Sequence, residues 1–186
     1  MRVILVDENQ EKMDEMAQHI RQTHPRAEIL AFPTQADLDR WLEENRPLRL
    51  RVQTFGNFEV FWGDQPVHFE RSKTRELFAY LIDRRGAGST MGELISVLWE
   101  GRPDTAGLRS QLRNLITDLR ATFRDLGAEG VVIKGRDHIA VDPARVDCDY
   151  YRYLAGEKAV RAAFRGEYMS NYSWAEITVG SLQQKK

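Results

Sequence analysis

The hydrophobic pattern of the chain changes its period near Pro47, and this change divides the sequence into two folding units. Before Pro47, the apolar runs in "MRVILVD" and "AEILAF" are typical of buried strands. Each run precedes a segment with helical spacing, first 9–25, which Pro25 ends, and then 35–45, which Thr34 caps. Residues 1–47 therefore predict a β-α-β-α unit, the opening of an α/β sheet.

From Leu50 onward the apolar residues alternate with polar ones over short runs. "LRVQTF", "FEVFW" and "PVHFE" predict an antiparallel meander with glycine-containing turns. Three helical segments follow: "KTRELFAYLIDRRG" capped by Ser72, "MGELISVLWEG" with the capping-box spacing Thr90–Glu93, and residues 104–127. Residues 131–141 then predict a β-hairpin. Strands, three helices and a hairpin in this order predict an α+β winged helix over 48–142.

The helix predicted over 104–127 has two chemically different faces. On a helical wheel its leucines and Phe123 form one stripe, whereas the four arginines 109, 113, 120 and 124 lie within about 60° of one another. Arginine can donate two hydrogen bonds to guanine, and asparagine can pair with adenine in the major groove. We therefore predict DNA contacts from the exposed strip, near the bases for Arg109, Ser110, Arg113 and Asn114, and nearer the backbone for Thr117 and Arg120. The alternative is an ordinary solvated face.

Two further basic clusters favour the same interpretation. The tip of the predicted hairpin carries Lys134, Arg136 and His138, which could reach a neighbouring phosphate track or the minor groove. Arg71 and Lys73 stand at a predicted helix N-terminus, where exposed amides suit a phosphate. The alternative for both clusters is unremarkable surface charge.

Several segments taken together resemble a known family. "FGNFEVFWGDQPVHFERSKTRELFAYLIDRRG", "MGELISVLW" and "LRNLITDLRATF" are similar to the OmpR/PhoB-type winged-helix domain, and more narrowly to the branch of antibiotic regulatory proteins (SARP) and bacterial transcriptional activators. The resemblance implies a four-stranded N-terminal sheet, three helices and a C-terminal hairpin, with helix 104–127 reading DNA. It also implies that loop 100–107 contacts RNA polymerase. Residues 143–186 resemble the start of a helical activator domain, whose end, "SLQQKK", we expect to be disordered.

Residues 1–47 resemble the first part of the receiver domain of response regulators, the phosphorelay proteins of two-component systems. "ILVDEN" is similar to the acidic pair that holds Mg²⁺ in receivers, which maps onto Asp7 and Glu8. A receiver also needs a third strand with an acceptor aspartate and later a lysine, but Pro47 leads directly into the meander. We therefore expect a vestigial acidic pair without metal, no cofactor, and no control by phosphorylation of this chain.

The charge and the counts of cysteine and histidine narrow the remaining classes of protein. The formal net charge is −1, but residues 1–47 hold 10 acids and 6 bases, so the rest of the chain is slightly basic. A single cysteine, Cys148, excludes an internal disulfide, and the four histidines lack metal-ligand spacing. The sequence shows neither a nucleophile–base pair nor a phosphate-binding glycine loop, so we do not expect an enzyme. Without a secretory or membrane-spanning stretch, we expect a cytoplasmic protein.

A β-α-β-α unit of this size leaves apolar faces and a sheet edge that it can hardly cover alone. We expect it to bind a second copy, edge to edge or by helix packing, or to dock on its own winged helix. The functional prediction is a homodimeric, sequence-specific regulator of transcription that binds double-stranded DNA. The alternative is a winged-helix interaction module that does not read DNA, and the salt dependence of binding separates the two.

Overall fold

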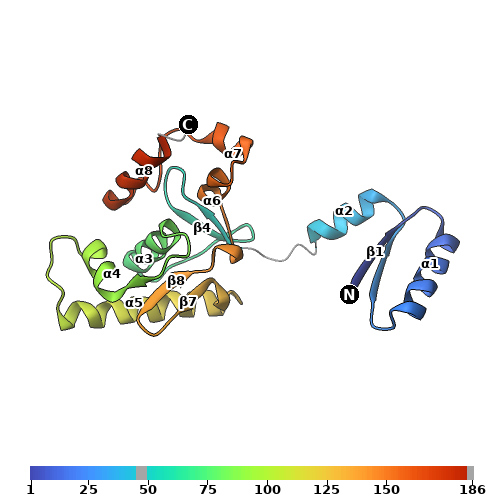
Figure 1. The fold of residues 1–186 in the computed structure, drawn as a ribbon, viewed down its shortest axis with the longest axis horizontal. Coiled ribbons are helices and arrows are strands. Elements are labelled where there is room, and N and C mark those ends of the chain that lie inside the picture. The colour runs from blue at the N-terminus through green and yellow to red at the C-terminus, as the bar shows by residue number, and fades with distance from the viewer. Residues whose placement is uncertain (45–49, 184–186) are drawn as a thin grey trace. The chain divides into compact units, whose positions relative to one another are not determined.

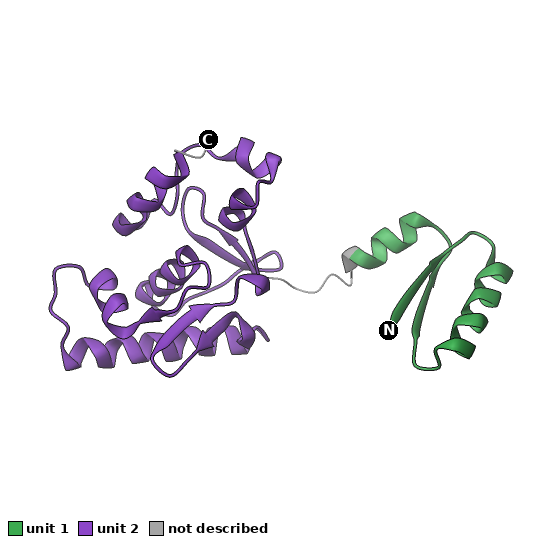
Figure 2. Cartoon of the chain, viewed as in Figure 1, with its two compact units in different colours: residues 1–47 green, residues 48–186 purple. Residues whose placement is uncertain are grey.

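The computed structural model describes residues 1–44 and 50–183 and divides the chain into two compact units, Met1–Pro47 and Leu48–Lys186 (Figure 2). The mixed α+β class predicted from the sequence is confirmed. The predicted linker around Pro47 lies outside the described residues. Within the described part of the chain, no helix has the length and apolarity needed to cross a bilayer.

Unit 1, residues 1–47, contains two strands and two helices in alternation, as the hydrophobic runs predict (Figure 1). They are β1 (Arg2–Val6), α1 (Gln10–Thr23), β2 (Glu28–Phe32) and α2 (Gln35–Glu44). The two strands pair in parallel, with Ile4 opposite Leu30. Asn9 caps α1 and Thr34 caps α2, each side-chain oxygen accepting a hydrogen bond from a backbone N–H three residues on.

The core of unit 1 is small. It consists of the buried side chains Leu5, Met13 and Ala17, to which Val3, Ile20 and Ile29 add partly buried surface. These residues come from α1 and from the sheet face that α1 covers. On the α2 side, the rings of Phe32 and Trp41 approach to 5.5 Å between centroids.

The first sheet of unit 2, residues 48–186, has the strand order β5-β4-β3-β9. Its members are β3 (Leu50–Gln53), β4 (Glu59–Trp62), β5 (Gln65–Pro66) and β9 (Val146–Cys148). β3 pairs antiparallel with β4 and parallel with β9. The fourth strand therefore comes from a segment that we assigned to a following domain over 143–186. The sheet crosses that expected boundary, and residues 48–186 form one compact unit.

Three helices pack together beside this sheet: α3 (Ser72–Asp83), α4 (Met91–Leu98) and α5 (Ala106–Asp125). Their apolar faces meet in one core, in which the rings of Phe78 and Phe123 lie 4.8 Å apart. Thr105 caps α5 through a 3.2 Å hydrogen bond from the Leu108 amide. Ser72 does not cap α3, in contrast to the prediction, because the cap position falls on Arg71 and Ser72 is already the first helical residue.

The hairpin belongs to a second sheet of three strands in the order β6-β8-β7. β7 (Val132–Lys134) and β8 (His138–Val141) form the predicted hairpin, while β6 (Ser89–Thr90) pairs with β8 immediately before α4. Thr90 lies opposite His138 in this pairing. The hairpin is thus joined by backbone hydrogen bonds to the start of α4.

The C-terminal segment packs on the same core (Figure 1). It contains α6 (Asp149–Leu154), α7 (Lys158–Ala163) and α8 (Glu176–Gln183), with a short 3-10 helix at Ser173–Ala175. Two further 3-10 helices, Glu129–Val131 and Pro143–Arg145, precede and follow the hairpin. Tyr153, Phe164 and Tyr168 are buried. Part of the end expected to be disordered, Ser181 to Gln183, is helical, because Leu182 is buried and its carbonyl accepts a hydrogen bond from the Tyr153 hydroxyl. Residues 184–186 lie outside the described chain.

One carboxylate ties this segment to the first sheet. Asp149, at the start of α6, accepts hydrogen bonds from the backbone amides of Thr54 (2.9 Å) and Phe55 (3.0 Å) and from the Thr54 hydroxyl (2.6 Å). Thr54 is fully buried, so no solvent replaces these bonds.

We predict that Asp149→Ala lowers the free energy of unfolding by about 3 kcal/mol, because two backbone donors and a hydroxyl lose their acceptor. Urea denaturation followed by circular dichroism measures the change. Asp147→Ala is the control, since Asp147 makes a half-exposed ion pair with Arg152, whose loss should cost less than about 1 kcal/mol. Equal midpoints for the two variants would contradict this role for Asp149.

Cys148, in β9, is 1% exposed, and burial raises the pKa of its thiol well above the ordinary value. Only the thiolate reacts readily with thiol reagents. We predict that a disulfide reagent leaves the folded chain unmodified at pH 8 and labels it fully in urea. Rapid labelling of the folded chain would show that β9 opens.

Candidate nucleic-acid interface

A hollow of about 510 Å³ lies between the beginning of α4, the first half of α5 and the turn of the hairpin. Arg109 and Arg113 of α5 line it together with Lys134 and Arg136 of the hairpin turn. We call this hollow the helix–hairpin groove. It brings together two predicted basic clusters that lie more than 20 residues apart in the sequence.

The packing of α5 decides which of its residues face the groove. Leu112, Leu119 and Phe123 are fully buried, and Leu108 and Leu115 are at most 5% exposed. Because this stripe is held in the core, the opposite face must lie outside. The predicted division of the helix into a buried and an exposed face is confirmed. The contact residues predicted on α5 are all exposed: Arg109, Ser110, Arg113, Asn114, Thr117 and Arg120.

Arg109 is not a free cation. Its guanidinium makes a bidentate pair with Asp104, with Nε to Oδ1 at 2.9 Å and Nη2 to Oδ2 at 2.6 Å. These hydrogen bonds raise the pKa of Arg109. The carboxylate neutralises and orients a side chain that the sequence analysis placed near the bases. A spacing of five residues across the helix cap is the signal that could have indicated this pair.

Four other cations around the groove and along α5 make no ion pair with the described residues: Arg113, Arg120, Lys134 and Arg136. Elsewhere in unit 2 some cations are paired, for example Arg124 with Asp125 at 3.6 Å, whereas others, such as Arg102 and Lys158, make no ion pair with the described residues. Asp137, in the hairpin turn, is the acid that lines the groove beside them. The uncompensated charge on this face is therefore positive and attracts an anionic partner.

Hydroxyl groups at the start of α4 complete the groove. Ser89 is fully buried, and its Oγ has no hydrogen-bond partner within the described residues. Thr90 caps α4, with Oγ1 accepting from the Glu93 amide at 3.3 Å. The groove thus contains a helix N-terminus next to basic side chains, a combination suited to phosphate oxygens.

The second half of the predicted capping box does not form. The Glu93 carboxylate instead accepts a 2.9 Å hydrogen bond from the Tyr80 hydroxyl and pairs with Arg84 at 3.3 Å. Burial, and then the bond to Glu93, raise the pKa of Tyr80 to about 12. Glu93 therefore joins α4 to α3 and is not available at the groove.

The ring of His138 fills space that two glycines leave open. A Cβ atom on Gly88 would lie 2.8 Å from its Cδ2, and one on Gly135 would lie 2.9 Å from its Nδ1. Any larger residue at either position would displace the ring. The sequence analysis placed His138 at the hairpin tip but did not detect this packing, because the contact depends on how β6 and the turn meet.

Arg71 and Lys73, which we predicted at a phosphate, lie apart from the residues that line the groove. Arg71 pairs with Asp118 of α5. Lys73 donates to Glu76 (2.7 Å) and to the Leu98 carbonyl (2.8 Å). Both side chains therefore connect α3 with its neighbouring helices, and their donors are largely occupied.

The acidic pair of unit 1 also has internal partners. The Asp7 carboxylate accepts hydrogen bonds from Lys12 Nζ (2.5 Å) and from the Asn9 amide (3.0 Å). The Lys12 contact lowers the pKa of Asp7. Glu8 is exposed. Over the described ranges, no group of three or more potential metal-ligand side chains gathers in one place.

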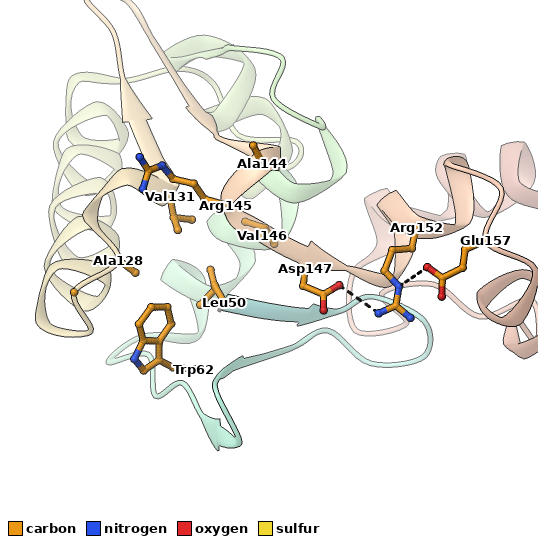
Figure 3. A pocket seen from close by; sticks show the side chains of 11 residues that line it. Leu50, Trp62, Ala128, Val131, Ala144, Arg145, Val146, Asp147, Arg152 and Glu157 are labelled. Carbon is orange, nitrogen blue, oxygen red and sulfur yellow. Dashed lines mark hydrogen bonds and ion pairs between the residues drawn. The ribbon is translucent and has the colours of Figure 1, made fainter. Parts of the chain in front are cut away.

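A second hollow, of about 650 Å³, opens beside β9 (Figure 3). Leu50, Val131 and Val146 form its apolar part. One of its two cations, Arg152, is held between Asp147 (3.3 Å) and Glu157 (3.1 Å), as Figure 3 shows, and the other, Arg145, pairs with Asp142 at 3.4 Å. Because these charges are already compensated, this hollow does not compete with the helix–hairpin groove as an anion-binding surface.

Comparison with known proteins identifies the fold. No family model and no curated protein matches the chain. Among solved structures, EmbR from Mycobacterium tuberculosis, in complex with a low-affinity phosphopeptide, matches 74% of this chain and 42% of its own with 21% identity and a TM-score of 0.62. The chain thus spans less than half the length of EmbR. The response regulator DrrB, an OmpR/PhoB homolog from Thermotoga maritima, matches with 12% identity over 75% of this chain and 98% of its own, but its TM-score of 0.35 supports no argument.

The likeness to EmbR establishes a shared fold, and at 21% identity it establishes nothing more. The chemistry of the exposed surface must carry any conclusion about function.

Proposed function

We propose that the chain is a transcription regulator that binds specific sequences of double-stranded DNA through the helix–hairpin groove. The observation that carries the proposal is the gathering of three cations without an ion pair among the described residues, Arg113, Lys134 and Arg136, in the groove where α5 and the hairpin meet. Arg120, also without such a partner, extends the exposed basic strip along α5. Lone arginines at scattered positions would be ordinary surface charge. Uncompensated cations that converge from two elements on one groove favour a polyanion.

The dimensions of α5 suit the major groove. Its 20 residues span about 30 Å, and a helix with side chains is about 10–12 Å across, which matches a groove about 12 Å wide. Arg113 and Asn114 then face base edges, while Thr117 and Arg120 lie nearer the backbone. The Thr117 hydroxyl donates to the Arg113 carbonyl at 2.9 Å, so it must exchange that bond in order to donate to a phosphate oxygen.

Arg109 enters this arrangement differently from Arg113. In the free protein its donors are engaged by Asp104, so contact with a base requires the guanidinium to exchange or share that carboxylate. Arg109 therefore binds a base only where that contact is strong enough to replace the bidentate ion pair with Asp104. Arg109 therefore contributes to selectivity more than to overall affinity.

The hairpin and the start of α4 face the DNA backbone in this proposal. Lys134 and Arg136 bind the adjacent phosphates or the minor groove. The amides at the start of α4 line the same groove and suit a phosphate oxygen. Arg71 and Lys73 hold α3 to its neighbours and support the reading surface indirectly.

Loop 100–107 is exposed at every position, and we place the contact with RNA polymerase there. Asp104 within it bonds to Arg109, so the loop and the reading helix are linked. Phosphorylation of this chain has no part in the proposal, because the described residues of unit 1 contain no third strand that could end in an acceptor aspartate. Selection of bound fragments from random double-stranded DNA tests the proposal. Recovery of no enriched sequence would favour an interaction module instead.

We predict that Arg113→Ala weakens binding to the selected sequence by about 1–3 kcal/mol and relaxes the preference for one base pair, because a bidentate base contact is lost. Competition binding against single-base variants of the site measures both effects. Arg124→Ala is the matched control, since it removes the same charge from the same helix at a residue already paired with Asp125. Equal losses for the two variants would show that Arg113 acts only as a charge.

We predict that Lys134→Ala weakens binding to all DNA sequences alike and reduces the slope of log affinity against log salt by about 1, because one phosphate contact is lost. Fluorescence anisotropy at several salt concentrations gives the slope. Lys158→Ala removes an exposed lysine from α7, outside the groove, and should leave the slope unchanged. If the two variants have the same slope as the parent chain, the hairpin does not touch DNA.

A further inference from the structure

Unit 1 exposes an unusual share of the apolar surface. Seven large hydrophobic side chains are exposed among the described residues, and five of them belong to unit 1, which is about a quarter of the chain. They are Met1, Ile4, Val6, Met16 and Leu42. Two of these residues, Ile4 at 40% and Val6 at 38% exposure, are neighbours on one face of β1. Exposed apolar residues that gather on one element mark an interaction surface.

The backbone of β1 is also incompletely paired. The Met1 carbonyl accepts from the Glu28 amide (3.0 Å), and the Asp7 amide donates to the Phe32 carbonyl (3.3 Å). Because N–H and C=O groups alternate in direction along a strand, the odd-numbered residues of β1 bond to β2. The groups of Arg2, Ile4 and Val6 therefore point to the other edge, where no strand of the described chain pairs with them.

The opposite edge of this sheet is blocked. The same alternation directs Ile29 and Ala31 of β2 outward, and the next outward position is Pro33, which has no N–H to donate. Proline at a sheet edge prevents further strand addition. β1 contains no proline, and its outward positions form a regular run of three residues.

The helices cover the two strands unequally. Ile4, Val6, Leu30 and Phe32 share one face of the sheet, since paired residues of neighbouring strands point to the same side. Leu30 and Phe32 are partly buried on the side where α2 packs, whereas Ile4 and Val6 remain exposed. The uncovered strip therefore follows β1 and ends at its free edge.

We infer that β1 pairs antiparallel with β1 of a second copy of the chain, with Ile4 opposite Ile4 on a two-fold axis. Arg2 then lies opposite Val6 of the other copy, and the pairing closes a four-stranded sheet in the order β2-β1-β1-β2. The three outward residues of each strand are spaced symmetrically about Ile4, so their N–H and C=O groups all find partners. The side chains of Ile4 and Val6 from both copies form one apolar strip.

Charge complementarity selects a second copy as the occupant of this edge. In the antiparallel arrangement the start of one strand, where Arg2 is paired with Glu28 at 2.9 Å, lies beside the end of the other, where Asp7 is paired with Lys12 at 2.5 Å. Glu8, which makes no ion pair with the described residues, then lies near the exposed Arg2 of the other copy, so opposite charges meet at each end. A parallel arrangement would align like charges at both ends. A two-stranded sheet is marginally stable alone, whereas four strands with helices on their faces bury a continuous core.

This interface goes beyond the proposed function and does not rest on it, because it uses unit 1 alone. The test is therefore made without DNA. Sedimentation equilibrium of the full chain should give twice the monomer mass of 21.5 kDa at micromolar concentration. A monomer at high micromolar concentration overturns the inference and leaves the proposal of DNA binding intact.

Two proline variants show which strand edge of unit 1 forms the dimer interface. Ile4→Pro removes an N–H that points outward from β1 and leaves the bonds to β2 in place, so it should reduce the measured mass to that of a monomer. Ala31→Pro removes an outward N–H from β2 in the same sheet and should remain a dimer. Far-UV circular dichroism checks that both variants retain their helices. A dimeric Ile4→Pro chain, or a monomer produced by Ala31→Pro alone, overturns the pairing through β1.

Disulfide cross-linking tests the register without relying on a destabilised variant. Residues opposite each other in a hydrogen-bonded antiparallel pair have Cα atoms about 5.5 Å apart, within the range of about 4.4–6.8 Å that a disulfide needs. Ile4→Cys should therefore form a covalent dimer rapidly under mild oxidation, and Ala31→Cys should not. The native Cys148 is buried and adds no background. Equal, slow cross-linking of both variants would indicate random collision and overturn the register.

Discussion

The burial of one stripe of α5 is the constraint on which the rest of unit 2 depends. Leu112, Leu119 and Phe123 are withdrawn completely from solvent, and Phe123 meets Phe78 of α3 in the centre of the core. A helix held this firmly cannot rotate about its axis, so its arginines must remain on the outer surface. The orientation of the exposed face of α5 is thus set by apolar packing, and the charges on that face contribute little to the fold.

Much of this architecture follows from periodicity and local chemistry. Apolar runs locate β1 and β2, the helical stripe locates α5, and Thr34 and Thr105 mark helix starts by the capping rule. Short strands are a different case. β6 and β9 contain two and three residues, and their pairing is decided by where tertiary contacts bring them, so no window of sequence contains the information. For the same reason, the sequence did not indicate that β9 pairs with β3, and residues 48–186 were not predicted to form one compact unit.

The candidate site shows the same division between local and tertiary information. Sequence alone places the arginines on one face of a helix and the hairpin cations at a turn, but it cannot tell a free cation from a paired one. Arg109 is engaged by Asp104 and Arg71 by Asp118, whereas Arg113 has no acid partner in the described chain. Asp104 lies only five residues before Arg109 in the sequence, whereas Asp118 is 47 residues from Arg71, and only the fold brings that pair together. Electrostatic arguments about a surface therefore need the positions of the acids as much as those of the bases.

The pairing of β6 with β8 has a consequence for the proposed mode of DNA recognition. Because Thr90 lies opposite His138, the hairpin is joined to the residue that caps α4, and α4 packs on α5. Helix α5 and the hairpin then behave as one rigid body, in which the two DNA-contacting elements have a fixed separation. A duplex that meets both elements must supply the matching groove width itself, by its own bending and twist. The protein should consequently discriminate among base steps that none of its side chains touch, favouring those whose stacking yields most easily to that spacing.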